Sequence, residues 1–348
     1  MRAVVYTGEQ TVRVDEVPEP RLADARDAVV RVTKTSICAS DLHLLSGKTQ
    51  GMRAGGVIGH EFVGTIADAG DGTPWNEGDR VLGSFLIACG NCTPCTMGRY
   101  NHCRERRALG LGELTGDLDG AQADFVRVPY ADVNLRSISA DKVPLTEEQA
   151  LFSGDILATG FYAASLARLS PDDVVAIIGA GPIGLCCALA TRLAGSRVLV
   201  FDADPRRVEF ATALGLEAVD VSGEPAESAA RVATEGAGVD VAMEAVGSID
   251  AFRSAMKCVR DGGRVVVVGV YGAERYGLSM GMTWIRGLDL VFTGMANVHA
   301  HWDDALDAIV DHRLNPAQLI THRLSLDDAV EGYELFGSRV AMKVVLTP

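Results

Sequence analysis

The stretch Val174-Val-Ala-Ile-Ile-Gly179-Ala-Gly181-Pro-Ile-Gly184 decides the fold of this chain. Its five leading apolar residues are too few for a free-standing helix and predict a short buried strand. The glycines follow in the spacing G-x-G-x-x-G, and the apolar run Leu185–Leu193 predicts a helix directly after them. Such a turn presents the first N–H groups of the helix to a pyrophosphate. The expected dinucleotide-binding residues are therefore Gly179, Gly181, Pro182, Ile183 and Gly184.

A carboxylate after the next predicted strand supports this interpretation. The strand Arg197–Phe201 ends at Asp202, which lies 18 residues after Gly184. Dinucleotide-binding folds place there the carboxylate that accepts hydrogen bonds from the adenosine ribose. Its charge would repel the 2′-phosphate of NADP, so Asp202 favours NAD, while Arg206 and Arg207 close behind keep NADP open. The alternative is a glycine turn in an ordinary α/β protein.

Length, composition and charge restrict the class of protein. A chain of 348 residues suggests about two domains. The net charge of −14 disfavours nucleic acid and anionic membranes as partners. No stretch approaches the ~20 apolar residues of a membrane span, and the start lacks the apolar core of a signal peptide. We therefore expect a cytoplasmic protein whose clustered cysteines are metal ligands rather than disulfides.

The first and last parts of the sequence predict one β-rich domain, spanning 1–156 and 293–348. Short alternating segments broken by Gly, Pro and Asp predict strands. The clearest are Ala28–Thr33, Phe62–Ala67 and Arg80–Gly83. Near the end, a predicted helix at Trp302–His312 leads to a last strand at Lys343–Leu346, which we expect to pack back onto this domain.

The middle part, 157–292, predicts a Rossmann-type coenzyme domain, because strands alternate there with helices. We expect strands near residues 174, 197, 239 and 264, and helices at Arg206–Leu214 and Ile249–Arg260. The segment Val265–Gly269 is typical of a parallel strand that is buried on both faces. The predicted fold class is α/β, with a doubly wound parallel sheet beside the β-rich domain.

Half of the eight cysteines lie in one short segment with the spacing C-x2-C-x2-C-x7-C. They are Cys89, Cys92, Cys95 and Cys103. Four thiolates fit a closed tetrahedral zinc site, which is structural because no position stays open. An iron–sulfur cluster is the alternative. The ferredoxin spacing, however, has three residues before its last cysteine and a proline after it, and this segment has neither.

A second, dispersed set of metal-ligating residues precedes this segment. Cys38 lies in Ile37-Cys38-Ala-Ser40-Asp-Leu-His43, and Gly59-His60-Glu61 follows. Alone, a cysteine or histidine is more often a core or surface residue. Together with the other motifs, a thiolate, an imidazole and one more ligand predict a zinc ion whose fourth position accepts an oxygen. The remaining cysteines, expected in helices of the core, are Cys186, Cys187 and Cys258.

These motifs together resemble the medium-chain, zinc-dependent alcohol dehydrogenases over essentially the full length. The resemblance implies that the β-rich domain is GroES-like, that Cys38 and His60 bind a catalytic zinc, and that Glu61 can approach the metal. Asp155, four residues before Thr159, takes the place of the third ligand. It departs from the better-known Cys/His/Cys set and is similar to the branch of secondary-alcohol and formaldehyde-type dehydrogenases. A helix N-cap is the alternative role for Asp155.

The resemblance also implies a mechanism. Zinc polarises the alcohol oxygen and favours the alkoxide, Ser40 takes the proton, and His43 passes it to solvent. Hydride then moves to a nicotinamide that Thr159 helps to position. Further implied coenzyme contacts are Val246, Arg207 near the adenosine and Lys343 near the pyrophosphate. Surface solvation is the alternative for the two basic residues.

The expected function is that of an NAD-dependent zinc alcohol dehydrogenase acting on a small-molecule alcohol or its carbonyl partner. We expect two zinc ions per chain and a homodimer or homotetramer, with a contact near residues 264–294. One alternative is a polyol, sugar or aminocyclitol dehydrogenase, which the loops 46–57 and 271–284 would decide. Another is a non-catalytic dinucleotide sensor. Such a sensor would need none of Cys38, Ser40, His43, His60 and Asp155.

Overall fold

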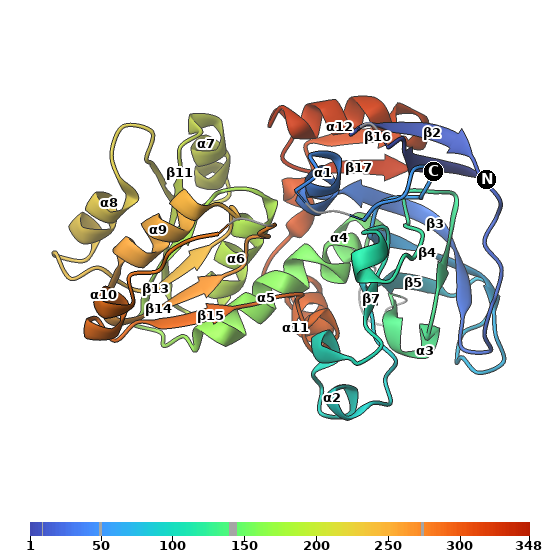
Figure 1. Ribbon diagram of the computed structural model, residues 1–348, viewed down its shortest axis with the longest axis horizontal. Coiled ribbons are helices and arrows are strands. Elements are labelled where there is room, and N and C mark those ends of the chain that lie inside the picture. The colour runs from blue at the N-terminus through green and yellow to red at the C-terminus, as the bar shows by residue number, and fades with distance from the viewer. Residues whose placement is uncertain (9, 49–50, 139–144, 273–274) are drawn as a thin grey trace. The chain divides into compact units, whose positions relative to one another are not determined.

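The computed structural model describes residues 1–8, 10–48, 51–138, 145–272 and 275–348. The chain forms two compact units (Figure 1). The first unit comprises Met1–Ala158 and Met295–Pro348, and the second comprises Thr159–Gly294. Each bound lies two residues from the one expected. The α/β fold class, with a parallel-sheet unit and a β-rich unit, is confirmed.

The second unit is built on a six-stranded parallel sheet. Its spatial order is β12 (Glu217–Asp220), β11 (Arg197–Asp202), β10 (Val174–Ile178), β13 (Val239–Glu244), β14 (Val259–Val267) and β15 (Asp289–Phe292). From β10 the chain runs outward to β12 and then returns to pair β13 on the other side of β10. Such a reversal is the point where ligands bind at the carboxyl ends of the strands in doubly wound folds.

Helices connect these strands. They are α5 (Ile156–Ala167), which begins at the boundary of the two units, α6 (Pro182–Leu193), α7 (Pro205–Ala213), α8 (Ala226–Ala233), α9 (Ile249–Cys258) and α10 (Met280–Ile285). The expected helix Ile249–Arg260 is too long, because β14 already begins at Val259. The pairing of β13 with β14 is irregular there, and Gly262, with a φ of +71°, allows the chain to turn within the strand.

The first unit is built on a seven-stranded sheet. Its strands are β16 (His322–Ser325), β17 (Val344–Thr347), β3 (Ala28–Ile37), β4 (Glu61–Ala69), β5 (Arg80–Gly83) and β9 (Leu135–Ser137), with β8 (Phe125–Val128) also pairing β3. Smaller antiparallel pairs are β1 (Arg2–Tyr6) with β2 (Val12–Glu16), and β6 (Leu86–Ile87) with β7 (Arg107–Ala108). Because β17 pairs β3 antiparallel, the C-terminal segment completes the sheet that the N-terminal segment begins.

The helices of the first unit are short, apart from two near the C-terminus. They are α1 (Ala39–Leu45), α2 (Thr93–Thr96), α3 (Ala131–Asn134), α4 (Glu147–Leu151), α11 (Val298–Val310) and α12 (Ala329–Gly337). The 3-10 turns are η1 (Tyr100–His102), η2 (Glu113–Thr115), η3 (Phe152–Gly154), η4 (Pro316–Leu319) and η5 (Leu326–Asp328). The strand expected to end at Thr33 continues to Ile37, since buried Thr35 donates its hydroxyl to the carbonyl of Glu61.

Among the residues that the structure describes, no single helix has the length and apolar composition to cross a membrane, although the bent pair Glu147–Gly154 and Ile156–Ala167 passes that test when its halves are joined.

Candidate functional site

The three glycines of the turn after β10 meet different requirements. Gly179 has a φ of +106°, and a Cβ there would lie 2.6 Å from Cγ2 of Val246. A Cβ on Gly184 would lie 1.9 Å from the carbonyl oxygen of Gly179, so helix and turn touch there. At Gly181 the nearest atom to a Cβ is the Arg207 guanidinium, at 3.7 Å. The protein's own packing thus requires glycine at 179 and 184, whereas a Cβ at Gly181 would make only an ordinary contact with Arg207.

Asp202 lies at the carboxyl end of β11, directly beside this turn. Its Oδ2 accepts the N–H of Ala180 at 2.7 Å, and its Oδ1 accepts the N–H of Asp204 at 2.9 Å. Arg207 Nη1 lies 3.9 Å from the same Oδ2. Arg206 instead pairs with Asp204 at 2.8 Å, and its hydrogen bond lowers the pKa of Asp204 to about 2. The basic side chain nearer to the Asp202 carboxylate is therefore Arg207, not Arg206.

Sequence reasoning missed a buried carboxylate on the neighbouring strand. Glu244, at the end of β13, accepts the N–H groups of Val246 and Gly247 through Oε1, both at 2.7 Å. Its Oε2 accepts the hydroxyl of Tyr271 at 3.0 Å. Burial raises the pKa of Glu244, and these donors oppose the shift. Glu244 thereby holds the segment that carries Val246, which touches the glycine turn and is 49% exposed.

Thr159 is buried at the start of the second unit, with Gly160 next to it. A Cβ on Gly160 would lie 2.7 Å from the backbone of Cys186, so only glycine allows α5 to approach α6 this closely. The pair Thr159-Gly160 thus marks a tight helix contact. Cys186, Cys187 and Cys258 are buried, as expected for core residues.

A cluster of four metal-ligating side chains lies in the interior of the first unit. Ligand atoms of Cys38, His60, Glu61 and Asp155 all lie within 4.8 Å of one another. Asp155 Oδ2 is 3.7 Å from Cys38 Sγ and 3.4 Å from His60 Nε2. Cys38 directly precedes α1, and Asp155 links η3 to α5. His60 directly precedes β4, which begins at Glu61. Although Asp155 is placed where a helix cap would be, its carboxylate faces the thiol and the imidazole.

The electrostatics of this cluster favour a cation. Burial raises the pKa of the Cys38 thiol, and Glu61 and Asp155 raise it further. Burial alone would lower the pKa of His60, but Asp41 and Asp155 raise it well above its usual value. The contributions of the carboxylates to both shifts favour bound protons, as a negative potential in the cluster does. Once Cys38 and His60 give up these protons, a thiolate and two carboxylates against one lysine ammonium, Lys343, leave an excess that a divalent cation would neutralise.

Lys343 is where the structure corrects the sequence interpretation. The alternative of a solvated surface lysine is wrong, because the side chain is 1% exposed. Its Nζ lies 2.5 Å from Glu61 Oε2, which also accepts the hydroxyl of Ser36. Burial alone would lower the pKa of Lys343, but Glu61 and Cys38 raise it, so the ammonium form is kept. A contact with a coenzyme pyrophosphate stays a prediction.

The two expected proton-transfer residues are placed differently. Ser40 Oγ lies 3.0 Å from His60 Nε2, beside the proposed ligand atoms, and the side chain is partly exposed. His43 is also partly exposed but lies in the last turn of α1, outside the cluster of ligand atoms. Of the two residues, Ser40 therefore lies next to the candidate metal ligands and His43 does not.

Asp41 is a further residue that sequence reasoning missed. It is fully buried, and its Oδ1 lies 3.2 Å from His60 Nδ1. Its Oδ2 accepts the N–H of Cys38 at 2.9 Å. A histidine that donates Nδ1–H to a carboxylate keeps Nε2 free for a metal, which is the usual arrangement behind metal-binding imidazoles. The sequence signal that could have identified Asp41 was its position three residues after Cys38, at the start of a helix.

The four cysteines of the short segment also come together. The sulfur–sulfur distances are 3.5 Å for Cys92–Cys95 and Cys89–Cys103, and 3.9 Å for Cys92–Cys103. A tetrahedron with Zn–S bonds of about 2.3 Å has edges of about 3.8 Å. Backbone N–H groups of Cys89 and Glu105 point at Cys103 Sγ, at 3.3 and 3.4 Å. Backbone N–H groups of Arg104 and Cys95 lower the pKa of the Cys92 thiol to about 6. The donor set fits a closed zinc site.

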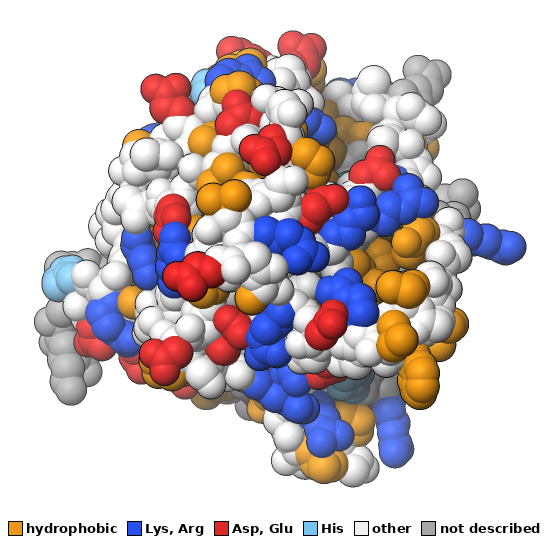
Figure 2. Space-filling view, turned by 90° about the vertical axis from the view of Figure 1, so that its left-hand side faces the viewer, with side chains coloured by type: hydrophobic (Ala, Val, Ile, Leu, Met, Phe, Trp, Pro, Cys, Tyr) orange, Lys and Arg blue, Asp and Glu red, His pale blue; other side chains and the backbone are white. Residues whose placement is uncertain are grey.

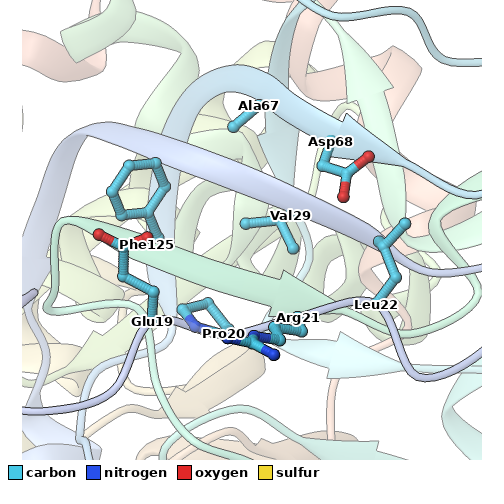
Figure 3. A pocket seen from close by; sticks show the side chains of 8 residues that line it. All are labelled: Glu19, Pro20, Arg21, Leu22, Val29, Ala67, Asp68 and Phe125. Carbon is cyan, nitrogen blue, oxygen red and sulfur yellow. The ribbon is translucent and has the colours of Figure 1, made fainter.

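The first unit also carries a hollow of about 420 Å³ that the sequence did not predict (Figure 3). It is lined by Glu19, Pro20, Arg21, Leu22, Val29, Ala67, Asp68 and Phe125. None of these residues belongs to the two clusters or to the glycine turn. We therefore assign it no part in the chemistry.

Both units resemble known dehydrogenases. Residues 24–136 match the alcohol dehydrogenase GroES-like domain, and residues 182–311 match the zinc-binding dehydrogenase family. A solved alcohol dehydrogenase from Thermus sp. ATN1 is 40% identical, with a TM-score of 0.93, covering 100% of this chain and 99% of its own. A glutathione-independent formaldehyde dehydrogenase from Pseudomonas aeruginosa is 30% identical over 100% of this chain and 97% of its own. A zinc-binding dehydrogenase from Sinorhizobium meliloti 1021, solved bound to NADP, is 28% identical, with a TM-score of 0.85, covering 100% and 99% of the two chains.

Proposed function

This chain belongs to the zinc-dependent alcohol dehydrogenase family of oxidoreductases, and we propose that it oxidises a small or medium alcohol reversibly to the aldehyde or ketone, with NAD as the hydride acceptor. The observation that carries the proposal is the buried cluster of Cys38, His60 and Asp155 with the Ser40 hydroxyl beside it. A dinucleotide-binding fold alone would need no such cluster, which argues against a non-catalytic sensor.

We assign Cys38, His60 and Asp155 as the ligands of a catalytic zinc. When bound, zinc supplies Lewis acidity toward an alcohol or carbonyl oxygen. Ser40, 3.0 Å from His60 Nε2, is placed to accept a proton from an alcohol held there. The partly exposed His43 is the candidate for exchanging that proton with solvent. Glu61, paired with Lys343, keeps a buried negative charge close to the three ligands.

We propose Cys89, Cys92, Cys95 and Cys103 as the ligands of a second, structural zinc. The residues of this cluster lie in one short segment, so the ion would tie that segment together without touching the substrate. None of the eight cysteines lies in a disulfide, which supports a reducing, cytoplasmic location.

The proposed coenzyme is NAD, held by residues of the second unit. They are Thr159, Gly179, Gly181, Pro182, Ile183, Gly184, Asp202, Arg207 and Val246. Gly181 caps α6 and brings no side chain before the first N–H groups of the helix, which suits a pyrophosphate. Asp202 suits the ribose hydroxyls, and its charge disfavours a 2′-phosphate. The NADP-bound relative from Sinorhizobium meliloti makes the choice between NAD and NADP the part of this proposal that most needs measurement.

The choice among alcohols, polyols and sugars was expected to depend on the loops 46–57 and 271–284. Residues 49–50 and 273–274 of these loops lie outside the described residues. The formaldehyde dehydrogenase relative supports a small alcohol or aldehyde as the substrate.

We further propose a homo-oligomer that uses the outer edge of the second unit. β15 is the last strand in the sheet order. Beside it, α10 exposes Met280, Met282, Trp284 and Ile285 by 59–81%, and Phe292 at the end of β15 is 64% exposed. Figure 2 shows hydrophobic side chains gathered on this side of the molecule. A second copy is the natural occupant, because an open strand edge flanked by apolar residues pairs with the same edge of a partner.

A combined metal and activity measurement tests the proposed function. We expect two zinc ions per chain by elemental analysis and NAD reduction with primary or secondary alcohols. A protein holding two zinc ions that reduces neither NAD nor NADP with any alcohol of a broad panel would contradict the assignment as an enzyme.

A further inference from the structure

A series of hydrogen bonds between buried side chains leads from the C-terminal helix α12 to Asp41, whose carboxylate lies beside His60. The hydroxyl of Tyr333, on α12, donates to Oε1 of Gln122 at 2.9 Å. Gln122 Nε2 then donates to Asp41 Oδ2 at 3.3 Å and to the carbonyl of Ser36 at 3.1 Å. Asp41 Oδ1 faces His60 Nδ1 at 3.2 Å. Gln122 and Asp41 are fully buried, His60 is 1% exposed and Tyr333 is 6% exposed.

Each hydrogen bond in this series has a defined direction. Burial and the nearby Asp41 raise the pKa of Tyr333 well above its usual value, so its hydroxyl keeps its proton and donates. Only the amide oxygen of Gln122 can accept it, and this leaves the amide nitrogen facing the carboxylate of Asp41. With one oxygen held by Gln122 and by the N–H of Cys38, the other oxygen of Asp41 is aimed at His60 Nδ1. With a metal bound, this carboxylate oxygen would favour the proton of His60 on Nδ1 and leave Nε2 as the metal ligand.

The backbone next to His60 is shaped around the same glutamine. Gly59 has a φ of +90°, and a Cβ there would lie 2.3 Å from Cγ of Gln122. The side chain of Gln122 therefore lies directly over the residue before the proposed ligand. Tyr333, at the other end, packs in an apolar cluster with Ile37, Phe336 and Val344, which fixes its ring. Packing fixes both ends of the series, so the Gln122 amide has one position.

We propose that Tyr333 and Gln122 are positioning residues that set the tautomer and direction of His60 at the catalytic metal. The inference rests on the proposed function, because it requires a metal at the cluster of Cys38, His60 and Asp155. Neither residue touches that cluster, and each acts through Asp41. Losing such outer partners typically weakens metal binding 10–100-fold.

The test compares Tyr333→Phe and Gln122→Met with Tyr6→Phe in the zinc-loaded enzyme. Tyr6 packs against the same apolar cluster, and its hydroxyl makes no hydrogen bond to any residue that the structure describes. The rate at which each of the two zinc ions passes to a chelator is measured, together with the visible spectrum of the cobalt-substituted protein. We expect the two variants to release one zinc ion about 10–100-fold faster and to shift the cobalt bands. The second zinc ion and the Tyr6→Phe protein should behave as in the wild type.

The outcomes separate this inference from the proposed function. A wild-type protein with fewer than two zinc ions would overturn both. A wild type with two zinc ions and alcohol-dependent NAD reduction, but variants with unchanged release rates and cobalt spectra, would overturn this inference alone. So would equal loosening of both ions with a lowered melting temperature, which is the result of a merely structural role. If Gln122→Met does not fold, Tyr333→Phe, which removes one oxygen atom, decides the question.

Discussion

The carboxylate of Asp202 holds the glycine turn, because its Oδ2 accepts the N–H of Ala180 at 2.7 Å. The proposed ribose-binding residue therefore also shapes the turn that would receive the pyrophosphate. A substitution that removes the side chain would change both features at once, whereas an amide would keep an acceptor for Ala180 and lose only the charge. Asp202→Asn is therefore the substitution that tests the role of the charge in coenzyme preference.

Asp202→Asn should lower the preference for NAD over NADP on the order of a hundredfold in kcat/KM. The variant loses a charge-assisted hydrogen bond to the ribose and the repulsion of a 2′-phosphate. The measurement is the ratio of kcat/KM with the two coenzymes at one alcohol concentration series. A ratio equal to that of the wild type would remove Asp202 from the coenzyme site.

Much of the fold could be predicted because it depends on local patterns. The bounds of β10 and β5 were predicted correctly, since each is a short apolar run that Gly or Asp residues delimit. The boundary after α9 could not be placed, because the helical pattern continues through Val259 and Arg260. There the pairing with β13, a long-range interaction, determines the structure.

The candidate site likewise contains some residues that could be predicted from the sequence and others that could not. Cys38, His60 and Asp155 were predictable because each lies in a short motif, and the structure brings them together. Asp41 lies three residues after Cys38, but Gln122 and Tyr333 are distant from it in the sequence, so only folding reveals their series of hydrogen bonds. The burial of Lys343 could not be predicted, because a lysine is rarely buried without a partner and its partner, Glu61, is distant in sequence.

Cys95→Ser should lower the free energy of unfolding while the zinc at Cys38, His60 and Asp155 stays bound. A closed four-thiolate site contributes its binding energy to folding and not to the reaction. Elemental analysis and chemical unfolding measure the two effects. The control is Cys258→Ala, which alters a buried cysteine outside both clusters and should keep two zinc ions. One zinc ion in the wild type, or iron, would contradict this prediction.

His299 should make the first unit less stable as the pH falls below 6.5. Burial lowers its pKa from 6.5 to about 3, and the ring stacks on Tyr100 and donates to Asn134 Oδ1. Above pH 6.5 neither the folded nor the unfolded form is protonated, so His299 adds no pH dependence. Between pH 6.5 and about 3 the unfolded form takes up a proton that the folded form does not. The free energy of unfolding therefore falls by about 1.4 kcal/mol per pH unit.

His299→Gln should remove this contribution. Urea unfolding of both proteins between pH 7.5 and 5 measures it, with the variant expected to show the shallower slope. Because both proteins keep the same metal ligands, any loss of zinc at low pH affects them alike. Parallel curves would show that His299 is protonated in the folded protein.

Trp284→Lys combined with Phe292→Lys should convert the proposed homo-oligomer into monomers. Two charges on an apolar contact between copies would repel each other and lose their hydration. Light scattering after size-exclusion chromatography measures the mass. Val232→Lys is the control, because it replaces another exposed apolar residue of the second unit, 83% exposed on α8. A wild type that is monomeric at micromolar concentration would refute the contact.

The last prediction concerns Asp155, for which a helix cap is the competing role. A lost cap costs about 1 kcal/mol of stability and leaves metal binding unchanged. A lost ligand loosens one zinc ion and removes most of kcat, since the metal's Lewis acidity is lost with it. Because the carboxylate faces Cys38 Sγ at 3.7 Å and His60 Nε2 at 3.4 Å, we expect Asp155→Ala to lose one zinc ion and its activity. Asp155→Cys should retain zinc and part of the activity, since thiolate is a good zinc ligand.

Thr146→Ala is the matched control for the cap. The side chain of Thr146 caps α4 by accepting the N–H of Gln149 at 3.2 Å. This variant should therefore lose about 1 kcal/mol of stability and keep both zinc ions. If Asp155→Ala behaves like Thr146→Ala, with two tightly held zinc ions and near-normal turnover, Asp155 is a cap. Glu61, whose Oε1 is buried without a hydrogen bond to any described residue, then becomes the third ligand.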